Sequence, residues 1–306
     1  MNKKIVFIAD FFVDQISGGG ELNNEELIDM LRGKDYNVEK IQSHFVDEQF
    51  LEKNRESFFI ISNFLGIKHH LREHLCDYDY IIYEHDHKYI KERDPATHFK
   101  FQAPPTSIVN YFFYKHALAV LCQSTFHQNI LELNLNIDNV INLSGNLWSL
   151  GSLEKMRDIA RKPKKDRYSI MDSKINHKNT IGAISYCNDK KCEYELIQDP
   201  NYFSFLEKLG SNKRFVFLPK TPETLSRVIV EARMMGNIVL TNGLVGAVEE
   251  TWFQLKGEEL IDHMIAKRED ILLTIEGLIK DLDEKSRPLV SMITTFCDGG
   301  DFLEGF

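Results

Sequence analysis

The chain has 306 residues, enough for one large or two medium domains, and its 43% hydrophobic and 27% charged residues are typical of a globular protein. Its 37 Lys and Arg against 46 Asp and Glu give a net charge of −9, which disfavours a nucleic-acid partner because such binding needs a basic face. No apolar run approaches the roughly 20 residues of a membrane span, and five mostly distant cysteines favour free thiols in a reducing cytoplasm.

In the first half, short apolar runs alternate with amphipathic segments, a pattern typical of strand–helix units in a parallel sheet. The first run is interrupted by Asp10 and lacks a small-residue cleavage site, so it favours a buried strand over a signal peptide. We expect strands at 4–12, 38–42, 57–62, 79–84, 117–123 and 140–143. We expect helices at 21–32, 68–76, 107–116 and 125–133.

A charged segment at 161–167, broken by Pro163, follows a predicted helix at 150–162. A solvated linker is favoured there over a phosphate-binding site. We therefore expect an N-terminal domain at 1–150 and a C-terminal domain at 151–306, with the tail 286–306 as a candidate for packing back on the N-terminal domain. The second half predicts strands at 168–171, 194–197, 214–218 and 238–241. It predicts helices at 179–187, 202–209, 223–235, 246–253 and 258–283.

The segment 217–242 carries the most specific pattern. Its strand ends at Pro219, and a helix is predicted to begin near Glu223 with Thr221 as its cap. Ligands of open parallel sheets bind beyond the carboxyl ends of the strands. The free backbone N–H groups of the first helical turn, together with the helix dipole, favour an anion at this point. These N–H groups belong to Thr224, Leu225 and Ser226.

Two glutamates in this segment are eight residues apart, slightly more than two helical turns. Glu223 and Glu231 can therefore approach one cleft. A carboxylate accepts two hydroxyl hydrogen bonds, which is how proteins commonly hold ribose or a hexose.

This segment resembles the donor-binding region of the retaining nucleotide-sugar glycosyltransferases with the GT-B fold (glycosyltransferase family 4-like, group 1). The family pattern is a Glu, seven residues, a second Glu, Ala, a Gly and an apolar strand, matched by Glu223, Glu231, Ala232, Gly236 and 238–241. The resemblance implies two Rossmann-like parallel-sheet domains facing across a cleft. It also implies a UDP- or GDP-sugar donor, with Glu223 beside the sugar as a catalytic residue and Glu231 on the ribose, and neither metal nor cofactor. The family usually has Gly and an aromatic residue after the first Glu, and the different residues here leave the sugar open.

Other positions take roles from the same resemblance. Gly19 and Gly20 follow the first strand, as in the family's glycine loop, where backbone approaches a phosphate or sugar closely. No G-x-G-x-x-G spacing is present, so NAD binding is disfavoured. Lys178 aligns with the lysine that contacts the donor diphosphate. With Lys220 or Arg227 it would stabilise the departing diphosphate, although a surface position for Arg227 is equally compatible with the sequence.

Two histidine motifs allow other interpretations. His85 and Asp86 follow a predicted strand on the acceptor side, where either could orient or deprotonate an acceptor hydroxyl. A charged surface loop carries the same weight, and a metal site formed with His87 is less favoured. His70 and His74 match an H-x-x-E-H zinc pattern on one helix face, but a solvated face is the favoured interpretation.

The sequence therefore predicts a hexosyltransferase-like enzyme that moves a sugar from a nucleotide-diphosphate sugar to an acceptor hydroxyl. Retention of the anomeric configuration is implied only by the resemblance. A GT-B-like nucleotide-sugar epimerase and a non-catalytic nucleotide-sugar binding protein are the alternatives. A glycan or lipid-linked acceptor is expected before a modified DNA base, given the acidic charge. We expect a cytoplasmic protein; the aromatic run 111–115 is a weak sign of peripheral membrane contact, and core packing is favoured for it.

Overall fold

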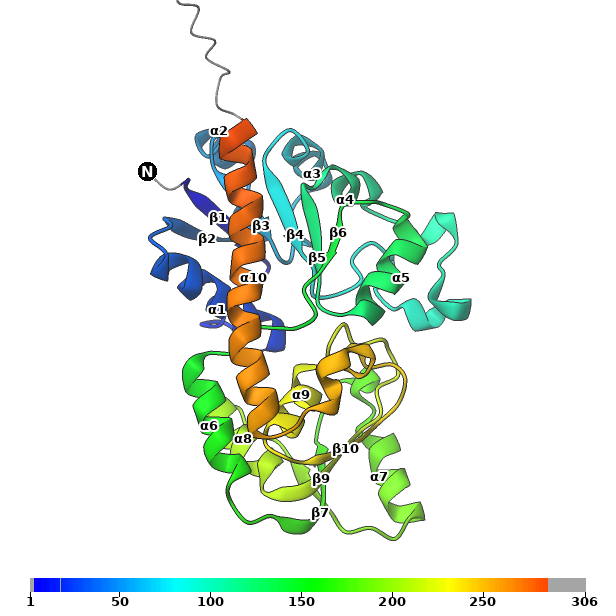
Figure 1. Ribbon diagram of the computed structural model, residues 1–306. Helices are drawn as coiled ribbons and strands as arrows, with labels where there is room; N and C mark the ends of the chain where they lie inside the picture. The colour runs from blue at the N-terminus through cyan, green and yellow to red at the C-terminus, as the bar shows by residue number, and fades with distance from the viewer. Residues whose placement is uncertain (1–2, 17, 286–306) are drawn as a thin grey trace, which may run out of the picture.

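The computed structural model describes residues 3–16 and 18–285, and it describes side chains up to residue 280. Two fully parallel sheets follow one another along the chain, with strand orders β2-β1-β3-β4-β5-β6 and β10-β9-β7-β8. They form two halves of the molecule, stacked end to end in Figure 1. No helix in the described part is long and apolar enough to cross a membrane.

The N-terminal half alternates strands and helices, as the sequence predicts. Strands β1, β3, β4 and β5 are buried throughout, which is why they read as uninterrupted apolar runs. The strands are β1 Ile5–Ala9, β2 Val38–Gln42, β3 Phe58–Ile61, β4 Tyr80–Tyr83, β5 Ala119–Cys122 and β6 Val140–Asn142, and the α-helices are α1 Gly19–Gly33, α2 Glu48–Lys53, α3 His69–Leu75, α4 Tyr111–His116 and α5 Thr125–Leu135. Short 3-10 turns are η1 Ser43–Phe45, η2 Pro95–Thr97, η3 Phe99–Phe101 and η4 Pro105–Ser107.

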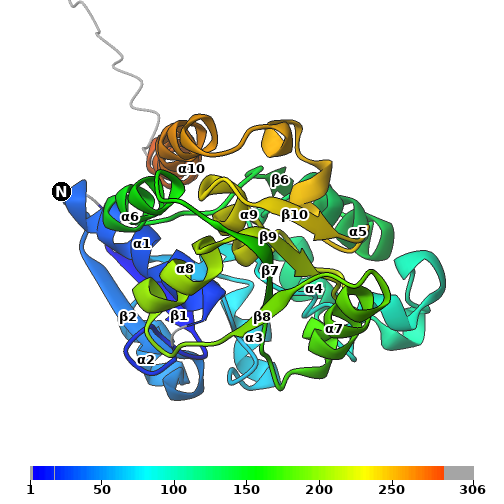
Figure 2. The ribbon, with the colours of Figure 1, turned by 90° about the horizontal axis from the view of Figure 1, so that it is seen from below.

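The C-terminal half has a smaller sheet with helices on both sides (Figure 2). Its strands are β7 Lys165–Met171, β8 Tyr194–Ile197, β9 Asn212–Phe217 and β10 Ile238–Thr241, and its α-helices are α6 Leu150–Ala160, α7 Thr180–Asp189, α8 Tyr202–Gly210, α9 Arg227–Met234 and α10 Glu258–Lys285. The 3-10 turns of this half are η5 Asn176–Lys178, η6 Gly246–Glu249 and η7 Thr251–Gln254.

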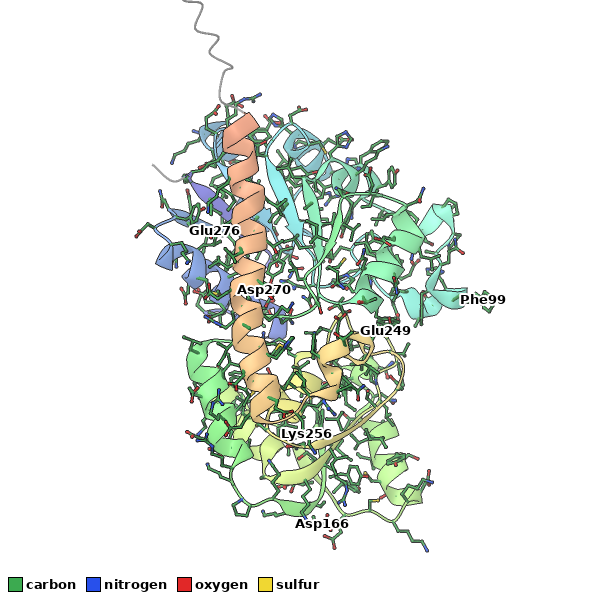
Figure 3. The ribbon with its side chains drawn as sticks, in the orientation of Figure 1. Phe99, Asp166, Glu249, Lys256, Asp270 and Glu276 are labelled. Atoms are coloured by element: carbon green, nitrogen blue, oxygen red, sulfur yellow. The ribbon has the colours of Figure 1, made fainter. Side chains whose placement is uncertain are left out.

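Helix α10 ties the two halves together. Its first turns bury Leu260, Ile261 and Met264 in the C-terminal core. One face further along buries Ile271, Leu272, Ile275 and Ile279 in the N-terminal core. Figure 3 shows Asp270 and Glu276 of this helix beside the N-terminal half and Lys256, just before it, beside the C-terminal half. The expected return of the chain to the N-terminal domain concerned residues 286–306, which lie outside the described residues; the described contact is made by α10.

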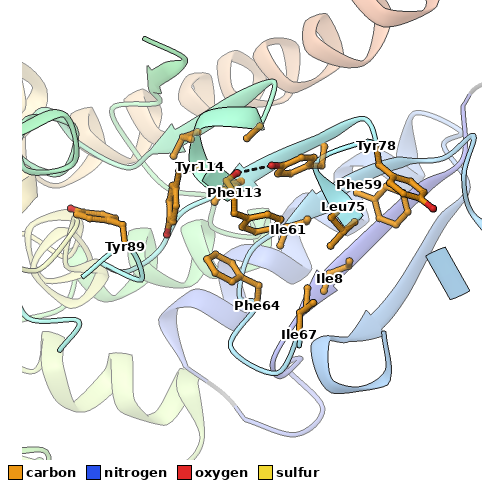
Figure 4. Close-up of a cluster of buried hydrophobic side chains, with 14 of the residues drawn as sticks. Ile8, Phe59, Ile61, Phe64, Ile67, Leu75, Tyr78, Tyr89, Phe113 and Tyr114 are labelled. Atoms are coloured by element: carbon orange, nitrogen blue, oxygen red, sulfur yellow. Dashed lines mark hydrogen bonds between the residues drawn. The ribbon is translucent and has the colours of Figure 1, made fainter. Parts of the chain in front are cut away.

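A hydrophobic cluster rich in aromatic residues packs in the core of the N-terminal half (Figure 4). Phe64 meets Phe113 and Tyr114 edge to face, with ring centroids 4.9 and 5.9 Å apart. The hydroxyl of Tyr80 donates to the Phe113 carbonyl at 2.6 Å. The core packing favoured for the aromatic run 111–115 is thus confirmed for Phe113 and Tyr114, whereas Phe112 is exposed.

Four predicted elements have different limits in the structure. The helix expected from residue 223 begins only at Arg227, and the helix expected at 246–253 is two 3-10 turns. The charged segment 161–167 is only partly a linker, because β7 begins at Lys165. The helix expected at 107–116 is shortened to α4, since η4 and an extended Ile108 precede it. Helix α2, capped by Asp47, was not predicted. Its six residues are too few to show a helical periodicity of apolar residues.

Candidate active site

Two adjoining cavities lie between the halves, at the carboxyl ends of both sheets. The first cavity, of about 430 Å³, reaches into the C-terminal half toward Tyr202, Phe205 and Glu231. The second cavity, of about 690 Å³, extends into the N-terminal half toward Asp86 and Arg93. Five residues line both cavities: Gly20, His85, Lys178, Glu223 and Thr224. Ligands of open parallel sheets bind in this position, outside the carboxyl ends of the strands.

Glu223 stands where the two cavities meet. It lies in extended chain after β9 and forms a parallel bridge with Val245, so its backbone is fixed outside any helix. Both carboxylate oxygens accept from Lys178 Nζ, at 2.7 and 3.0 Å. Lys178 ends η5, and α7 starts two residues later. Both residues were expected at the donor site, and the structure brings them into direct contact.

A row of free backbone N–H groups follows Glu223. Within the described residues, none of the five N–H groups of residues 224–228 donates a hydrogen bond. Ser226 has φ +71°, a left-handed conformation that turns the chain into α9. The cap is therefore Ser226, and the predicted cap Thr221 instead donates to Asp94 at 3.0 Å. The later start moves the helix dipole but keeps unpaired N–H groups beside the first cavity, a constellation that favours an anion.

Glu231 is buried on α9 but still lines the first cavity. Its Oε1 accepts from Trp148 Nε1 at 2.9 Å and from the Tyr202 hydroxyl at 2.7 Å. No donor among the described residues reaches Oε2. The two donors come from the segment before α6 and from the first turn of α8, so three elements fix the orientation of this carboxylate.

Arg227 is not a surface residue. Its side chain is 9% exposed, its guanidinium lies 4.5 Å from the centre of the Trp148 ring, and Nη1 donates to the Leu147 carbonyl at 2.5 Å. Nε is 3.6 Å from Oε1 of Glu231. A Cβ on Gly19, the first residue of α1, would lie 3.0 Å from Arg227 Cδ, so glycine lets this side chain pack closely against the start of the helix. Arg227 therefore places a positive charge at the first cavity.

His85 is held as a neutral ring. One ring nitrogen, Nε2, lies 2.7 Å from Oδ1 of Asn24, and the other accepts from the side-chain amide of Gln123. Burial, with the charges of Lys88 and Arg227, lowers the pKa of His85 to about 3. With both nitrogens occupied and so low a pKa, His85 is suited to positioning a ligand and poorly suited to removing a proton.

Asp86 faces the second cavity as a carboxylate. Burial alone would raise its pKa, but Lys88, Arg93 and His87 together hold that pKa below its ordinary value. Arg93 Nε donates to Oδ2 at 2.7 Å. Beneath this residue lies a buried ion pair of Glu84 and Lys88, which the sequence reasoning did not include.

Thr224 bridges the halves across the cleft. Its hydroxyl donates to Oε1 of Gln123 at 2.9 Å, and its carbonyl accepts from the hydroxyl of Ser124. A Cβ on Gly246 would collide with the Ser124 hydroxyl oxygen and the Thr224 carbonyl oxygen, so glycine is needed where the halves touch.

The remaining predicted site residues contribute less. Ser226 lines the first cavity, whereas Leu225 is fully buried in the C-terminal core and lines neither cavity. Lys220 lines neither cavity and bonds Asn176 at 3.2 Å. The sequence prediction of the site did not include Trp148, Tyr202 and Gln123. Of these three, Gln123 could have been predicted, because it directly follows strand β5.

No protein-family model matches the chain, and no curated protein sequence matches it. Among solved structures, the chain resembles Anabaena Alr3699/HepE in complex with UDP and glucose, with a TM-score of 0.52 at 12% identity over 93% of this chain and 99% of that one. A glycosyltransferase from Rickettsia africae ESF-5 has a TM-score of 0.48 and 14% identity, over 93% of this chain and 92% of that one. An alpha-glucosyltransferase in complex with UDP has a TM-score of 0.49 and 10% identity, over 93% of this chain and 94% of that one. The architecture, two parallel sheets facing across a cleft, is that of the GT-B nucleotide-sugar glycosyltransferases, so the predicted fold class is confirmed.

Proposed function

We propose that the protein is a glycosyltransferase that moves a hexose from a UDP- or GDP-sugar to an acceptor hydroxyl with retention of the anomeric configuration. The observation that supports it best is the first cavity: four residues with free backbone N–H groups (224 and 226–228), two cations and the fixed carboxylate of Glu231 line one pocket. An anion suits the N–H groups and the cations, and a ribose diol suits the carboxylate. A nucleoside diphosphate carries both groups.

In this proposal the donor lies along the first cavity. Glu231 accepts from the ribose through its unpaired Oε2, with Tyr202 and Phe205 toward the base. The diphosphate lies on the N–H groups of 224–228. Lys178 then exchanges Glu223 for the diphosphate, and Glu223 is released to contact the sugar hydroxyls. The donor thus replaces an ion pair that is only part-buried, which keeps the cost of breaking it small.

The acceptor lies in the second cavity, beside His85 and Asp86. The bond from the anomeric carbon to the diphosphate oxygen breaks, and its electron pair leaves with the diphosphate. A bond forms from that carbon to the acceptor oxygen, and the hydroxyl proton passes to the departing diphosphate. Lys178, Arg227 and the N–H groups stabilise the charge that develops there. Ionised Asp86 orients the acceptor hydroxyl, and the neutral ring of His85, whose nitrogens are both occupied, packs beside the acceptor.

Nucleotide binding is the first test. We expect one nucleoside diphosphate at about 100 times its dissociation constant to stabilise the protein by about 2.7 kcal/mol. For a chain of this length that is about 4 °C in melting temperature. Glu231→Gln keeps an oxygen for Trp148 and Tyr202 but removes the charge, and should lose most of the shift, whereas the exposed Glu259→Gln should keep it. No shift with any nucleotide would refute the donor site.

Turnover separates the alternatives. With a donor and a mixed acceptor library, a transferase releases nucleoside diphosphate and a glycoside whose anomeric configuration nuclear magnetic resonance can assign. A nucleotide-sugar epimerase changes the donor with no acceptor present, and a binding protein gives no product.

A cytoplasmic location is part of the proposal and is supported by the free thiols of Cys76, Cys122, Cys187 and Cys192.

A further inference from the structure

We propose that the acceptor of this enzyme is an uncharged polyhydroxylated molecule, such as a neutral sugar or glycan end, and that phosphate or carboxylate near the accepting hydroxyl is rejected. The inference rests on the proposed function, because it assigns the second cavity to the acceptor. It concerns the charge of that cavity, which the donor site does not determine.

The lining of the second cavity has more carboxylates than cations. Its two cations are already paired with carboxylates of the same lining: Arg93 with Asp86, and Lys178 with Glu223. Of three further lining carboxylates, Glu21 and Asp94 form no ion pair within the described residues, and Glu92 has no Lys or Arg partner but lies 3.5 Å from Nε2 of His98. A phosphate on the acceptor would therefore meet an uncompensated negative field.

These three carboxylates come from different elements and are not a single acidic loop. Glu21 lies in the first turn of α1, where burial, and then the charge of Asp10, raises the pKa of its carboxyl. Glu92 and Asp94 lie in the excursion between β4 and η2, and Asp94 accepts from Thr221 of the opposite half. The acidic side chains thus come from more than one side of the second cavity. The raised pKa makes Glu21 the weakest contributor to the negative charge, and Glu92 and Asp94 are the main ones.

Neutral hydrogen-bonding groups make up much of the rest. Asn63, Asn176 and Thr224 line the second cavity, and so does His87. His87 is 1% exposed, and its Nε2 has no hydrogen-bond partner in the described part of the chain. Its other nitrogen lies 2.8 Å from the Tyr89 hydroxyl. A buried polar atom without a partner is costly, and an acceptor hydroxyl is a partner of suitable size and polarity.

Donor binding strengthens the preference. When the diphosphate takes Lys178, Glu223 loses its cation and adds one more carboxylate without a Lys or Arg partner to the second cavity. The first cavity is lined by the carboxylates of Asp199, Glu223 and Glu231, but it also has the Arg227 guanidinium and the unpaired N–H groups of 226–228, which the second cavity lacks. Anion binding is therefore confined to the donor side of the cleft, and hydroxyl-rich neutral groups suit the acceptor side.

The test uses the full-length protein and the donor identified by the melting experiment. A library of methyl glycosides is offered in matched triplets: the neutral sugar, its 6-phosphate and its 6-carboxylate. We expect kcat/KM for the neutral member to exceed that for either anionic member by at least about 10-fold, the size that two uncompensated charges at surface dielectric would give. Equal or better transfer to an anionic member would overturn the inference, and so would donor hydrolysis with no transfer to any neutral member.

A charge-neutralised variant makes the test specific. Glu92→Gln with Asp94→Asn should reduce the discrimination against the 6-phosphate by about 3- to 10-fold and make it less dependent on salt. Glu56→Gln removes one exposed carboxylate at the opposite end of β3 and should leave the discrimination as in the wild type. Unchanged discrimination in the double variant would overturn the inference. Failure of the proposed function is distinguishable, because no nucleotide would then raise the melting temperature.

Discussion

A fully buried ion pair supports the loop that carries His85 and Asp86, and it gives a sharp stability prediction. Glu84 and Lys88 are both 0% exposed, and they pair directly. The Glu84 carboxylate also accepts from the Tyr114 hydroxyl and from the Asp86 N–H, the latter at 2.9 Å. Removing the cation would leave a desolvated carboxylate with only neutral donors.

We predict that Lys88→Met destabilises the protein by about 3–5 kcal/mol, the usual cost of leaving one buried charge without its partner. For 306 residues this is about 5–8 °C in melting temperature. The double variant Glu84→Gln with Lys88→Met removes both charges. It should lie within about 2 kcal/mol of the wild type, because a buried pair replaced by neutral groups of similar volume costs little.

The pH dependence adds a second signature. Burial raises the pKa of Glu84. In Lys88→Met the folded state therefore holds that proton more tightly than the unfolded state. The deficit against the wild type should shrink as the pH falls from 8 toward 5, by up to about 1.4 kcal/mol per pH unit.

Urea unfolding followed by circular dichroism measures all three proteins, with the exposed Lys53→Met as control, expected within about 0.5 kcal/mol of the wild type. A loss below about 1 kcal/mol in Lys88→Met would refute the reasoning. A double variant no more stable than Lys88→Met would refute it equally, since removing the carboxylate charge would then restore nothing.

Three further predictions concern the cleft. Thr224→Val removes the hydroxyl that donates to Gln123 across the cleft. It should lower kcat/KM for the acceptor about fivefold and leave nucleotide binding unchanged. Full activity would show that this hydrogen bond between the halves has no role in the reaction. Tyr202→Phe removes a donor to the Glu231 carboxylate and should cost about 1.5–3 kcal/mol in urea unfolding. Burial lowers the pKa of His87 to about 4. As the pH falls, the unfolded state therefore binds this proton first, and the free energy of unfolding falls between about pH 6.5 and about pH 4. His87→Asn should reduce the slope of the unfolding free energy against pH in this range by up to about 1.4 kcal/mol per pH unit, measured by urea unfolding.

The strands and the longer helices could be predicted from the sequence because their signals are local. Buried parallel strands appear as uninterrupted apolar runs, and both sheets contain the strands expected from such runs. The long amphipathic segment near the end predicted α10, whose apolar stripe serves both cores. The start of α9 could not be predicted in this way, because a bridge to Val245 holds Glu223 extended against its local helical signal.

The sequence by itself determined the two-sheet architecture, because it follows from apolar periodicity. The helical spacing that predicted Glu223 and Glu231 in one cleft does not apply, because Glu223 lies outside α9, and it is the tertiary structure that places both beside the first cavity. Only the tertiary structure decided what surrounds those carboxylates. Trp148 and Tyr202 reach Glu231 from 83 and 29 residues away, and His85 is neutral because Asn24 and Gln123 enclose it. The charge of the second cavity is likewise a tertiary property. Hydrogen bonds and desolvation depend on distance in space, and a sequence pattern records distance only along the chain.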